Sequence, residues 1–208
     1  MTIFQRNIPI NKIVELSQLC LQFARVNRVT YHEDGKRFES DTDHTVMLGI
    51  VACAFAEQFE PNLDRGLIAQ YALVHDFVEV YAGDTCTINA TGEQFADKAQ
   101  RESAALNRLK YQFSNTLPWL TATIESYDSL ASPEARFIKT LDKVLPKITH
   151  VLNKGAALID HGVAFSDIDS INAQQLLKIG LSYGYDQIEA MRLYTGIHED
   201  LIAELAKC

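Results

Sequence analysis

The stretch from Tyr71 to Asp84 (YALVHDFVEVYAGD) places two polar side chains inside one of the most apolar runs of the chain. His75 and Asp76 are adjacent, and Ala, Leu, Val and Phe surround them. Burial of an imidazole and a carboxylate is costly unless a partner compensates both groups. Any fold of this chain must therefore bring such a partner to the pair, and a metal ion is the natural candidate.

The same stretch is predicted to lie in a helix over Leu63 to Tyr81. A segment that is apolar almost all round is typical of a central helix covered by others. A buried strand is the alternative, but the length of the run favours a helix. The four-residue spacing from His75 to Glu79 then puts both side chains on one face. Asp84 follows Gly83 and, by itself, is as typical of a turn as of a functional site.

Helical periodicity recurs along the rest of the chain, and no alternating strand pattern is present. The cap signals Asp41-Thr42-Asp43 and Ser132-Pro133-Glu134 begin two of the helices. Pro146 is expected to kink the second of these. Loops are predicted over 27–42, 83–92 and 154–166. We therefore predict an all-α fold, with helices over 11–26, 41–60, 63–81, 97–113, 117–130, 132–152, 171–182 and 186–206.

The size of the chain predicts a single domain over 1–208. In this domain, helices over 167–206 pack on a core of about 28–153. The formal net charge of −8 disfavours binding to a nucleic acid polymer or to an anionic membrane. A small anionic substrate remains compatible with it, because a few local cations or a metal outweigh the overall field.

Cysteine spacing and the N-terminus indicate a cytoplasmic protein. The cysteines are widely separated, which excludes a zinc ribbon and a Cys-x-x-Cys redox motif. Free thiols of a reducing compartment are expected instead. Residues 1–16 lack the apolar core of a signal peptide, and no run reaches the roughly 18 apolar residues that span a bilayer. The four cysteines are Cys20, Cys53, Cys86 and Cys208.

Two further residues place metal-competent side chains in or beside apolar helices. His44 stands in the first turn of the helix after Asp41, and Asp142 lies within the helix after Ser132. Imidazole and carboxylate ligands suit one divalent transition metal (Mn, Co, Zn, Fe or Ni) and leave positions open for water or a phosphate oxygen. Taken singly, His44 and Asp142 are typical of ordinary structural residues. Only the His75-Asp76 pair indicates a functional site by itself.

The order of these residues resembles the H…HD…D signature of the HD-domain metal-dependent phosphohydrolases, which are all-α. The segment LVHDFVEVYAGD is similar to the HD..E...GD motif of one branch, the bacterial 5′-deoxynucleotidases and their eukaryotic relatives. Glu39-Ser40 with Asp43-His44 resembles the ES…(E/D)H motif of the same branch. The resemblance runs from about Arg28 to Asn153.

The resemblance implies a role for each matched residue. Glu79 would lie beside the activated water and the phosphate and assist proton transfer. Asp84 would contact the deoxyribose and discriminate against a 2′-hydroxyl. Arg28 would bind phosphate, a task that suits its guanidinium fork. The metal would be held by His44, His75, Asp76 and Asp142.

The chain departs from the family pattern in two places. Val29 stands where the family commonly has Trp after the phosphate-binding Arg, and the loop to His44 differs by a residue, so that Arg25 and Arg37 are alternatives to Arg28. The chain beyond Asn153 carries no motif of the family.

The resemblance implies a homodimer that removes the 5′-phosphate from deoxyribonucleoside monophosphates. A deoxynucleoside triphosphate triphosphohydrolase with the same metal site is the alternative. It would need several cations near the metal, for which Arg25, Arg28, Arg37 and Lys139 are available. A non-catalytic nucleotide-binding HD protein is a third hypothesis, which the complete set of ligand residues disfavours.

Overall fold

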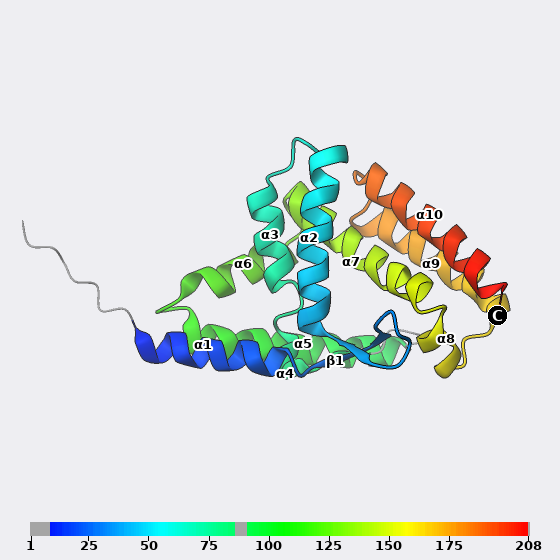
Figure 1. The fold of residues 1–208 in the computed structure, drawn as a ribbon. Coiled ribbons are helices and arrows are strands. Elements are labelled where there is room, and N and C mark those ends of the chain that lie inside the picture. The colour runs from blue at the N-terminus through cyan, green and yellow to red at the C-terminus, as the bar shows by residue number, and fades with distance from the viewer. Residues whose placement is uncertain (1–8, 86–90, 208) are drawn as a thin grey trace, which may run out of the picture.

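Helices form nearly all of the regular structure in the computed structural model (Figure 1). The structure describes residues 9–85 and 91–207, so the extreme N-terminus, Cys86, Cys208 and part of the predicted loop over 83–92 lie outside the described residues. The all-α prediction is confirmed. The elements are α1 (Ile10–Phe23), β1 (Asn27–Tyr31), β2 (Phe38–Ser40), α2 (Asp41–Phe59), α3 (Arg65–Val74), α4 (Glu79–Ala82), α5 (Gly92–Phe113), α6 (Pro118–Asp128), α7 (Pro133–Leu152), α8 (Ala156–Asp160), α9 (Phe165–Ser182) and α10 (Ile188–Leu205).

Helix α2 begins with a capping box that fixes the position of the first turn. The Ser40 hydroxyl accepts a hydrogen bond from the Asp43 backbone N–H at 3.1 Å. The Asp43 carboxylate accepts one from the Ser40 N–H at 3.0 Å. These bonds satisfy amide groups that have no partner within the helix. His44 is thereby held in the first turn of α2.

The loop predicted over 27–42 is partly wrong, because β1 and β2 pair there as an antiparallel hairpin. The Asp34 side chain accepts hydrogen bonds from the Lys36 and Arg37 amides and stabilises the turn. The Thr30 hydroxyl donates to Glu39 Oε2 at 2.5 Å, between buried positions of the two strands. A strand this short and this polar has no clear alternating pattern, which is why periodicity missed it.

The prediction of a single helix over 63–81 is wrong in the middle of that range. Helix α3 ends at Val74 and α4 begins at Glu79. Between them, the amides of Phe77 and Glu79 donate to carbonyls three residues earlier, which is a tighter turn than the α-helix. The uninterrupted helical face that was expected to carry both His75 and Glu79 is therefore absent.

The remaining differences from the sequence prediction concern helix boundaries. Helix α5 begins at Gly92 rather than at residue 97, because Thr91 and Gln94 form a capping box. Part of the predicted loop over 154–166 folds as α8, and α9 begins at Phe165. Helix α7 continues through Pro146, and the expected kink there stays a prediction.

The core consists of two hydrophobic clusters. The larger one includes Leu141 and Leu145 of α7, Leu48 of α2 and Tyr194 of α10. Figure 1 shows α10 and α9 running beside α7, while α1 lies along α5 at the other end of the molecule. The second cluster joins α1, α4, α5 and α6 around residues such as Phe77. The segment after α3 thus lies where the two clusters meet.

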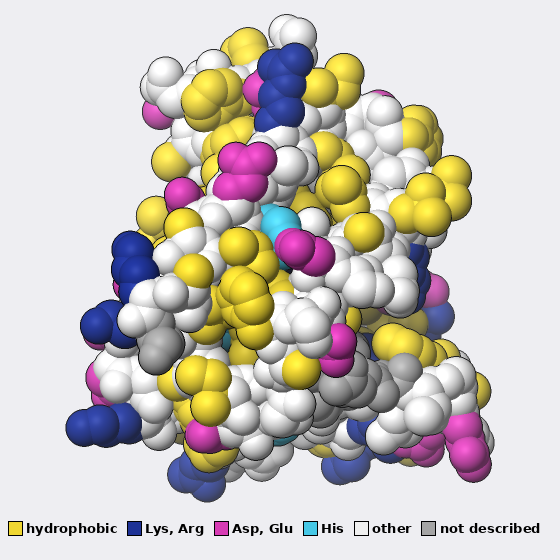
Figure 2. Space-filling model, turned by 90° about the vertical axis from the view of Figure 1, so that its right-hand side faces the viewer, with side chains coloured by type: hydrophobic (Ala, Val, Ile, Leu, Met, Phe, Trp, Pro, Cys, Tyr) yellow, Lys and Arg dark blue, Asp and Glu magenta, His cyan; other side chains and the backbone are white. Residues whose placement is uncertain are grey.

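Apolar side chains also remain exposed on the surface. Figure 2 shows exposed apolar side chains interspersed with charged residues on the face that lies on the right-hand side of Figure 1. On α9 and α10 the exposed apolar residues include Leu177, Leu181 and Ile188. The homodimer expected from the family stays a prediction. No helix in the described part of the chain has the length and apolar character needed to cross a bilayer.

We expect Leu145→Ala to lower the free energy of unfolding by about 2–5 kcal/mol, because it leaves a cavity in the larger cluster. Leu152→Ala is the matched control on the same helix, since Leu152 is 58% exposed. It should change the free energy by less than about 0.5 kcal/mol. Urea unfolding followed by circular dichroism measures both, and equal effects would contradict the assigned core.

Candidate metal centre and its cavity

Four side chains from three helical segments converge in the interior. His44 comes from the first turn of α2, His75 and Asp76 follow the end of α3, and Asp142 lies in the middle of α7. One donor atom from each of the four lies within 4.8 Å of the others. The residues whose order in the chain predicted a metal site are therefore brought together by the fold.

The environment of His75 fits a cation. Its Nδ1–H donates to the Ala72 carbonyl at 2.8 Å, which leaves the lone pair on Nε2. Nε2 is buried without a hydrogen-bond partner and lies 3.0 Å from Asp76 Oδ2 and 3.8 Å from Asp142 Oδ1. A lone pair facing two carboxylates is repelled by them. A metal ion among these atoms would turn that repulsion into coordination.

His44 lies between two carboxylates. Its Nε2 is 3.0 Å from Asp142 Oδ1, and its Nδ1 is 3.5 Å from Glu39 Oε1. A carboxylate behind the ring is the usual device that orients a metal-binding histidine. Glu39 is itself held by Thr30 across the hairpin. The sequence placed Glu39 in a motif but gave no role for it, because the pairing of β1 with β2 was not predicted.

Both acids of the cluster are held in the charged form. Burial works against ionisation of Asp142, but Lys143, with Nζ 2.6 Å from Oδ2, and His44 keep its pKa well below the usual range. Burial is likewise overcome at Asp76, where the positive charge of Arg28, with Nη1 2.9 Å from Oδ2, helps to hold the pKa well below its usual value. Ionised carboxylates are the form that binds a metal.

Glu79 lies beside this cluster in a different state. It is 2% exposed, accepts a hydrogen bond from Lys98 Nζ at 2.8 Å and has no partner for Oε2. Burial, and then the charge of Asp76, raise its pKa to about 9. Asp41 joins them, since donor atoms of Asp41, Asp76 and Glu79 lie within 4.8 Å of one another. The sequence identified Asp41 only as part of a helix cap, yet it is completely buried.

Arg28 projects from β1 to the same acids. Its Nη1 is 2.9 Å from Asp76 Oδ2 and 3.4 Å from Asp41 Oδ1, and its Nε is buried without a partner. Arg25 and Arg37, the alternatives considered from the sequence, are exposed and are not among the residues that line the cavity.

Asp84 reaches the cavity through a glycine-dependent turn. Gly83 has φ 72° and ψ 152°, a conformation that strongly favours glycine. The chain leaves α4 there, and Asp84 Oδ1 accepts a hydrogen bond from the Thr85 amide at 2.8 Å. Asp84 lines the cavity together with Arg28 and Glu79.

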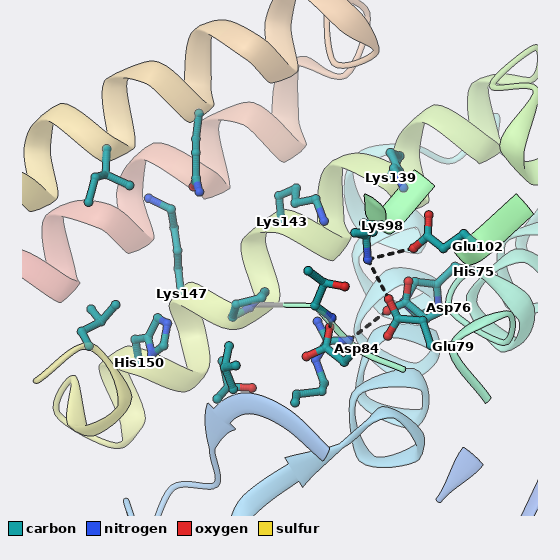
Figure 3. Close-up of a pocket in the computed structure, with 18 of the residues that line it drawn as sticks. His75, Asp76, Glu79, Asp84, Lys98, Glu102, Lys139, Lys143, Lys147 and His150 are labelled. Carbon is teal, nitrogen blue, oxygen red and sulfur yellow. Dashed lines mark hydrogen bonds and ion pairs between the residues drawn. The ribbon is translucent and has the colours of Figure 1, made fainter. Parts of the chain in front are cut away.

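A cavity of about 620 Å³ extends from this cluster toward the C-terminal helices. In the view of Figure 3, His75, Asp76 and Glu79 lie at one end, Lys147 and His150 at the other, and Asp84 between them. Three lysines at four-residue intervals on α7 also line it: Lys139, Lys143 and Lys147. Only Lys139 was singled out from the sequence, although this spacing itself places all three on one helix face.

Comparison with known proteins identifies the family of this chain. A family model described as HD domain matches residues 21–180. The chain is 26% identical over 133 residues to 5′-deoxynucleotidase HDDC2 of Homo sapiens, which covers 63% of each chain. It is 26% identical over 136 residues to the protein of the same name in Danio rerio, covering 64% of this chain and 66% of that one. The chain thus spans less than two thirds of the length of these relatives.

Solved structures share the fold. One is a predicted metal-dependent phosphohydrolase from Magnetospirillum magnetotacticum MS-1, with a TM-score of 0.75 and 22% identity over 98% of this chain and 97% of that one. Another is a conserved hypothetical protein from Pyrococcus furiosus, with a TM-score of 0.56 and 20% identity over 86% of this chain and 98% of that one.

We expect the purified protein to retain a divalent transition metal that His75→Ala loses, because this change removes a ligand whose nitrogen faces two carboxylates. His161→Ala, at an exposed position on a turn, should keep the wild-type content. Elemental analysis by mass spectrometry after gel filtration measures the metal per chain. Equal metal content in wild type and His75→Ala would place the metal elsewhere.

Acid should destabilise the fold partly through His150. Burial lowers its pKa from 6.5 to about 4, so the folded state holds the ring neutral while the unfolded chain takes up a proton below pH 6.5. The stability that this neutral ring provides is present above pH 6.5 and is lost as the pH falls to about 4. The shift corresponds to a loss on the order of 3 kcal/mol.

His150→Gln should therefore show a smaller fall in the free energy of unfolding over this range than wild type. Urea titrations at several pH values, in the presence of a chelator, measure the difference. Gln174→Ala, at an exposed position of α9, is the control and should follow wild type. Parallel curves for wild type and His150→Gln would refute the effect.

Proposed function

The chain belongs to the HD domain family, and on this premise we propose that it is a metal-dependent phosphohydrolase that removes the 5′-phosphate from deoxyribonucleoside monophosphates. The observation that carries the proposal is the convergence of His44, His75, Asp76 and Asp142 at one end of a cavity that Arg28, Glu79 and Asp84 also reach. The name of the relatives at 26% identity supports the choice of substrate.

The four converging residues would hold one divalent transition metal. Such an ion polarises a phosphoryl oxygen and lowers the pKa of water toward neutrality. Its imidazole and carboxylate ligands suit Mn, Co, Zn, Fe or Ni. Lys143 contacts Asp142, and Glu39 contacts His44. These contacts orient the two ligand side chains.

Arg28 binds the phosphate in this proposal. Its side chain is 12% exposed and lines the cavity beside Asp76, and its planar guanidinium fork can hold two phosphoryl oxygens at once. From this position on the cavity wall, the guanidinium can neutralise charge that develops on the phosphoryl group.

Glu79 moves the proton. Its Oε2 has no partner, and burial keeps the pKa high, so the carboxyl group can carry a proton at neutral pH. Departure of the nucleoside requires a proton on the 5′-oxygen, which a buried acid of this kind supplies. Lys98 holds Oε1 and so fixes the direction of Oε2.

In this proposal, Asp84 determines the preference for deoxyribose over ribose. It lies between the metal end and the opposite end of the cavity in the view of Figure 3, where the deoxyribose of a phosphate-anchored nucleotide would lie. A carboxylate close to C2′ disfavours the larger, differently hydrated ribose, because it leaves no room for the 2′-hydroxyl. Preference for deoxyribonucleotides is thereby assigned to Asp84.

A deoxynucleoside triphosphate triphosphohydrolase is the second candidate, and the lysines of the cavity favour it. Of the cations considered from the sequence, Arg28 and Lys139 line the cavity, and Lys98 and Lys143 lie there as well. Extra phosphates need extra cations of this kind. The two candidates differ in product, because dATP would yield tripolyphosphate from the second and no tripolyphosphate from the first.

The test is phosphate release from deoxy- and ribonucleoside 5′-monophosphates with added Mn²⁺ or Co²⁺. Deoxyribonucleotides should be hydrolysed in preference to ribonucleotides. Glu79→Gln should lower kcat by about 10²–10⁴-fold, the usual contribution of a general acid or base. Glu93→Gln, at an exposed position of α5, is the matched control and should leave kcat unchanged. Absence of turnover of every monophosphate would refute the proposal.

A further inference from the structure

The end of the cavity opposite the metal cluster has its own chemistry. Helix α7 enters it beyond Lys143, and α8, α9 and α10 complete its wall. We call this part the C-terminal arm, with Lys147, His150, Ile168, Ile171, Asn172 and Leu201 among its lining residues. The HD domain model ends at residue 180, so the wall from α10 lies beyond it.

The arm lies in the direction and at the distance of a nucleoside attached to a phosphate at the metal cluster. Lys147 and His150 follow Asp142 on α7 by about 7.5 and 12 Å along the helix axis. Figure 3 shows both side chains at the end of the cavity away from His75 and Asp76. If the sugar lies near Asp84, the base attached to it would therefore project into the arm.

The walls of the arm are apolar, and its polar groups carry no negative charge. Leu158, Val163, Ile168, Ile171 and Leu201 provide the apolar surface. Among the described residues that line the arm none is acidic, whereas the acids of the cavity gather at the other end. Apolar walls with a few placed polar groups are typical of a site for a flat organic ring.

The amide groups of the arm have their oxygens already occupied. Lys147 Nζ donates to Asn172 Oδ1, and an ammonium group has no acceptor, so this contact fixes which end of the amide is the oxygen. At Gln175, an exposed residue that also lines the cavity, Oε1 accepts a hydrogen bond from the Tyr194 hydroxyl at 2.8 Å. In the described part of the chain, neither amide nitrogen donates a hydrogen bond to another residue. Both nitrogens are therefore free donors.

His150 adds a flat, uncharged surface. Its side chain is buried on α7 and has an Nδ1 without a hydrogen-bond partner. Because burial keeps the pKa of the ring near 4, the ring is neutral at neutral pH. A neutral imidazole can lie against a heterocycle without attracting anions.

We propose that the C-terminal arm is the base subsite of the enzyme and that it selects bases with an oxo group in place of an exocyclic amino group. This inference rests on the proposed function, since it takes the phosphate to lie at the metal cluster. Amide donors match the oxo groups of uracil, thymine and hypoxanthine. Cytosine and adenine present an amino group at the corresponding position, so that two donors would face each other without an acceptor.

Two pairs of substrates test the selection: dUMP with dCMP, and dIMP with dAMP. The bases of each pair differ in whether they carry an oxo group or an exocyclic amino group at the same ring position. We expect KM to be about tenfold lower for the oxo member of each pair, as for one mismatched buried hydrogen bond. Calorimetry with deoxyuridine and deoxycytidine in the presence of EDTA should show the same order of affinity without phosphate or metal. Equal values within both pairs, or no binding of either nucleoside, would overturn the proposal.

Asn172→Asp is the decisive variant. It keeps an oxygen for Lys147 and replaces the free donor with an acceptor, so that the preference within each pair should disappear or reverse in both assays. Gln174→Glu adds the same charge at an exposed position of α9 that does not line the cavity, and it should preserve the wild-type preference. An unchanged preference in Asn172→Asp would refute the role of the amide.

The outcomes also separate this inference from the proposed function. If no monophosphate is hydrolysed but deoxyuridine binds better than deoxycytidine, the activity is wrong and the base subsite stands. If monophosphates are hydrolysed without any preference within the pairs, the activity stands and the base subsite is wrong.

Discussion

The structure depends on how it buries the polar pair His75-Asp76 between two hydrophobic clusters. Tyr71 and Ala72 pack in the larger cluster, whereas Phe77 belongs to the second, so the pair lies where the clusters meet. A polar segment at this place is costly unless all its groups have partners. The helix is interrupted there, His75 Nδ1 is satisfied by a local carbonyl, and Nε2 is left facing carboxylates, which is the arrangement of a metal ligand.

Charge balance around this pair explains several otherwise unrelated features of the fold. Buried acids near the cluster are matched by cations from different elements, with Arg28 from β1, Lys98 from α5 and Lys143 from α7. The small hairpin is needed because it delivers Arg28 to Asp76 and Glu39 to His44. Removal of one partner of such a buried network costs more than the loss of a surface pair, since it leaves an uncompensated charge.

The cavity divides into two chemical environments. Its inner end combines ionised ligands with Glu79, whose high pKa sets it apart from Asp76 and Asp142 although the three lie close together. The C-terminal arm has apolar walls and free amide donors instead. This division agrees with a ligand that has a charged end and a ring at the other, and it assigns a purpose to the C-terminal helices, for which the family motifs provide none.

The sequence by itself determined the helical class and most helix starts, because caps and apolar periodicity are local properties that act within a few residues. It also singled out His75 and Asp76, which stand out against an apolar background, whereas His44 and Asp142 were linked to them only by the resemblance to the HD family. Only the tertiary structure decided the break after Val74, the hairpin, the contact of Glu39 with His44 and the burial of Asp41 beside Asp76 and Glu79. These features arise from partners far apart in the chain. A one-dimensional pattern does not record that Arg28 meets Asp76 or that Lys147 fixes the amide of Asn172.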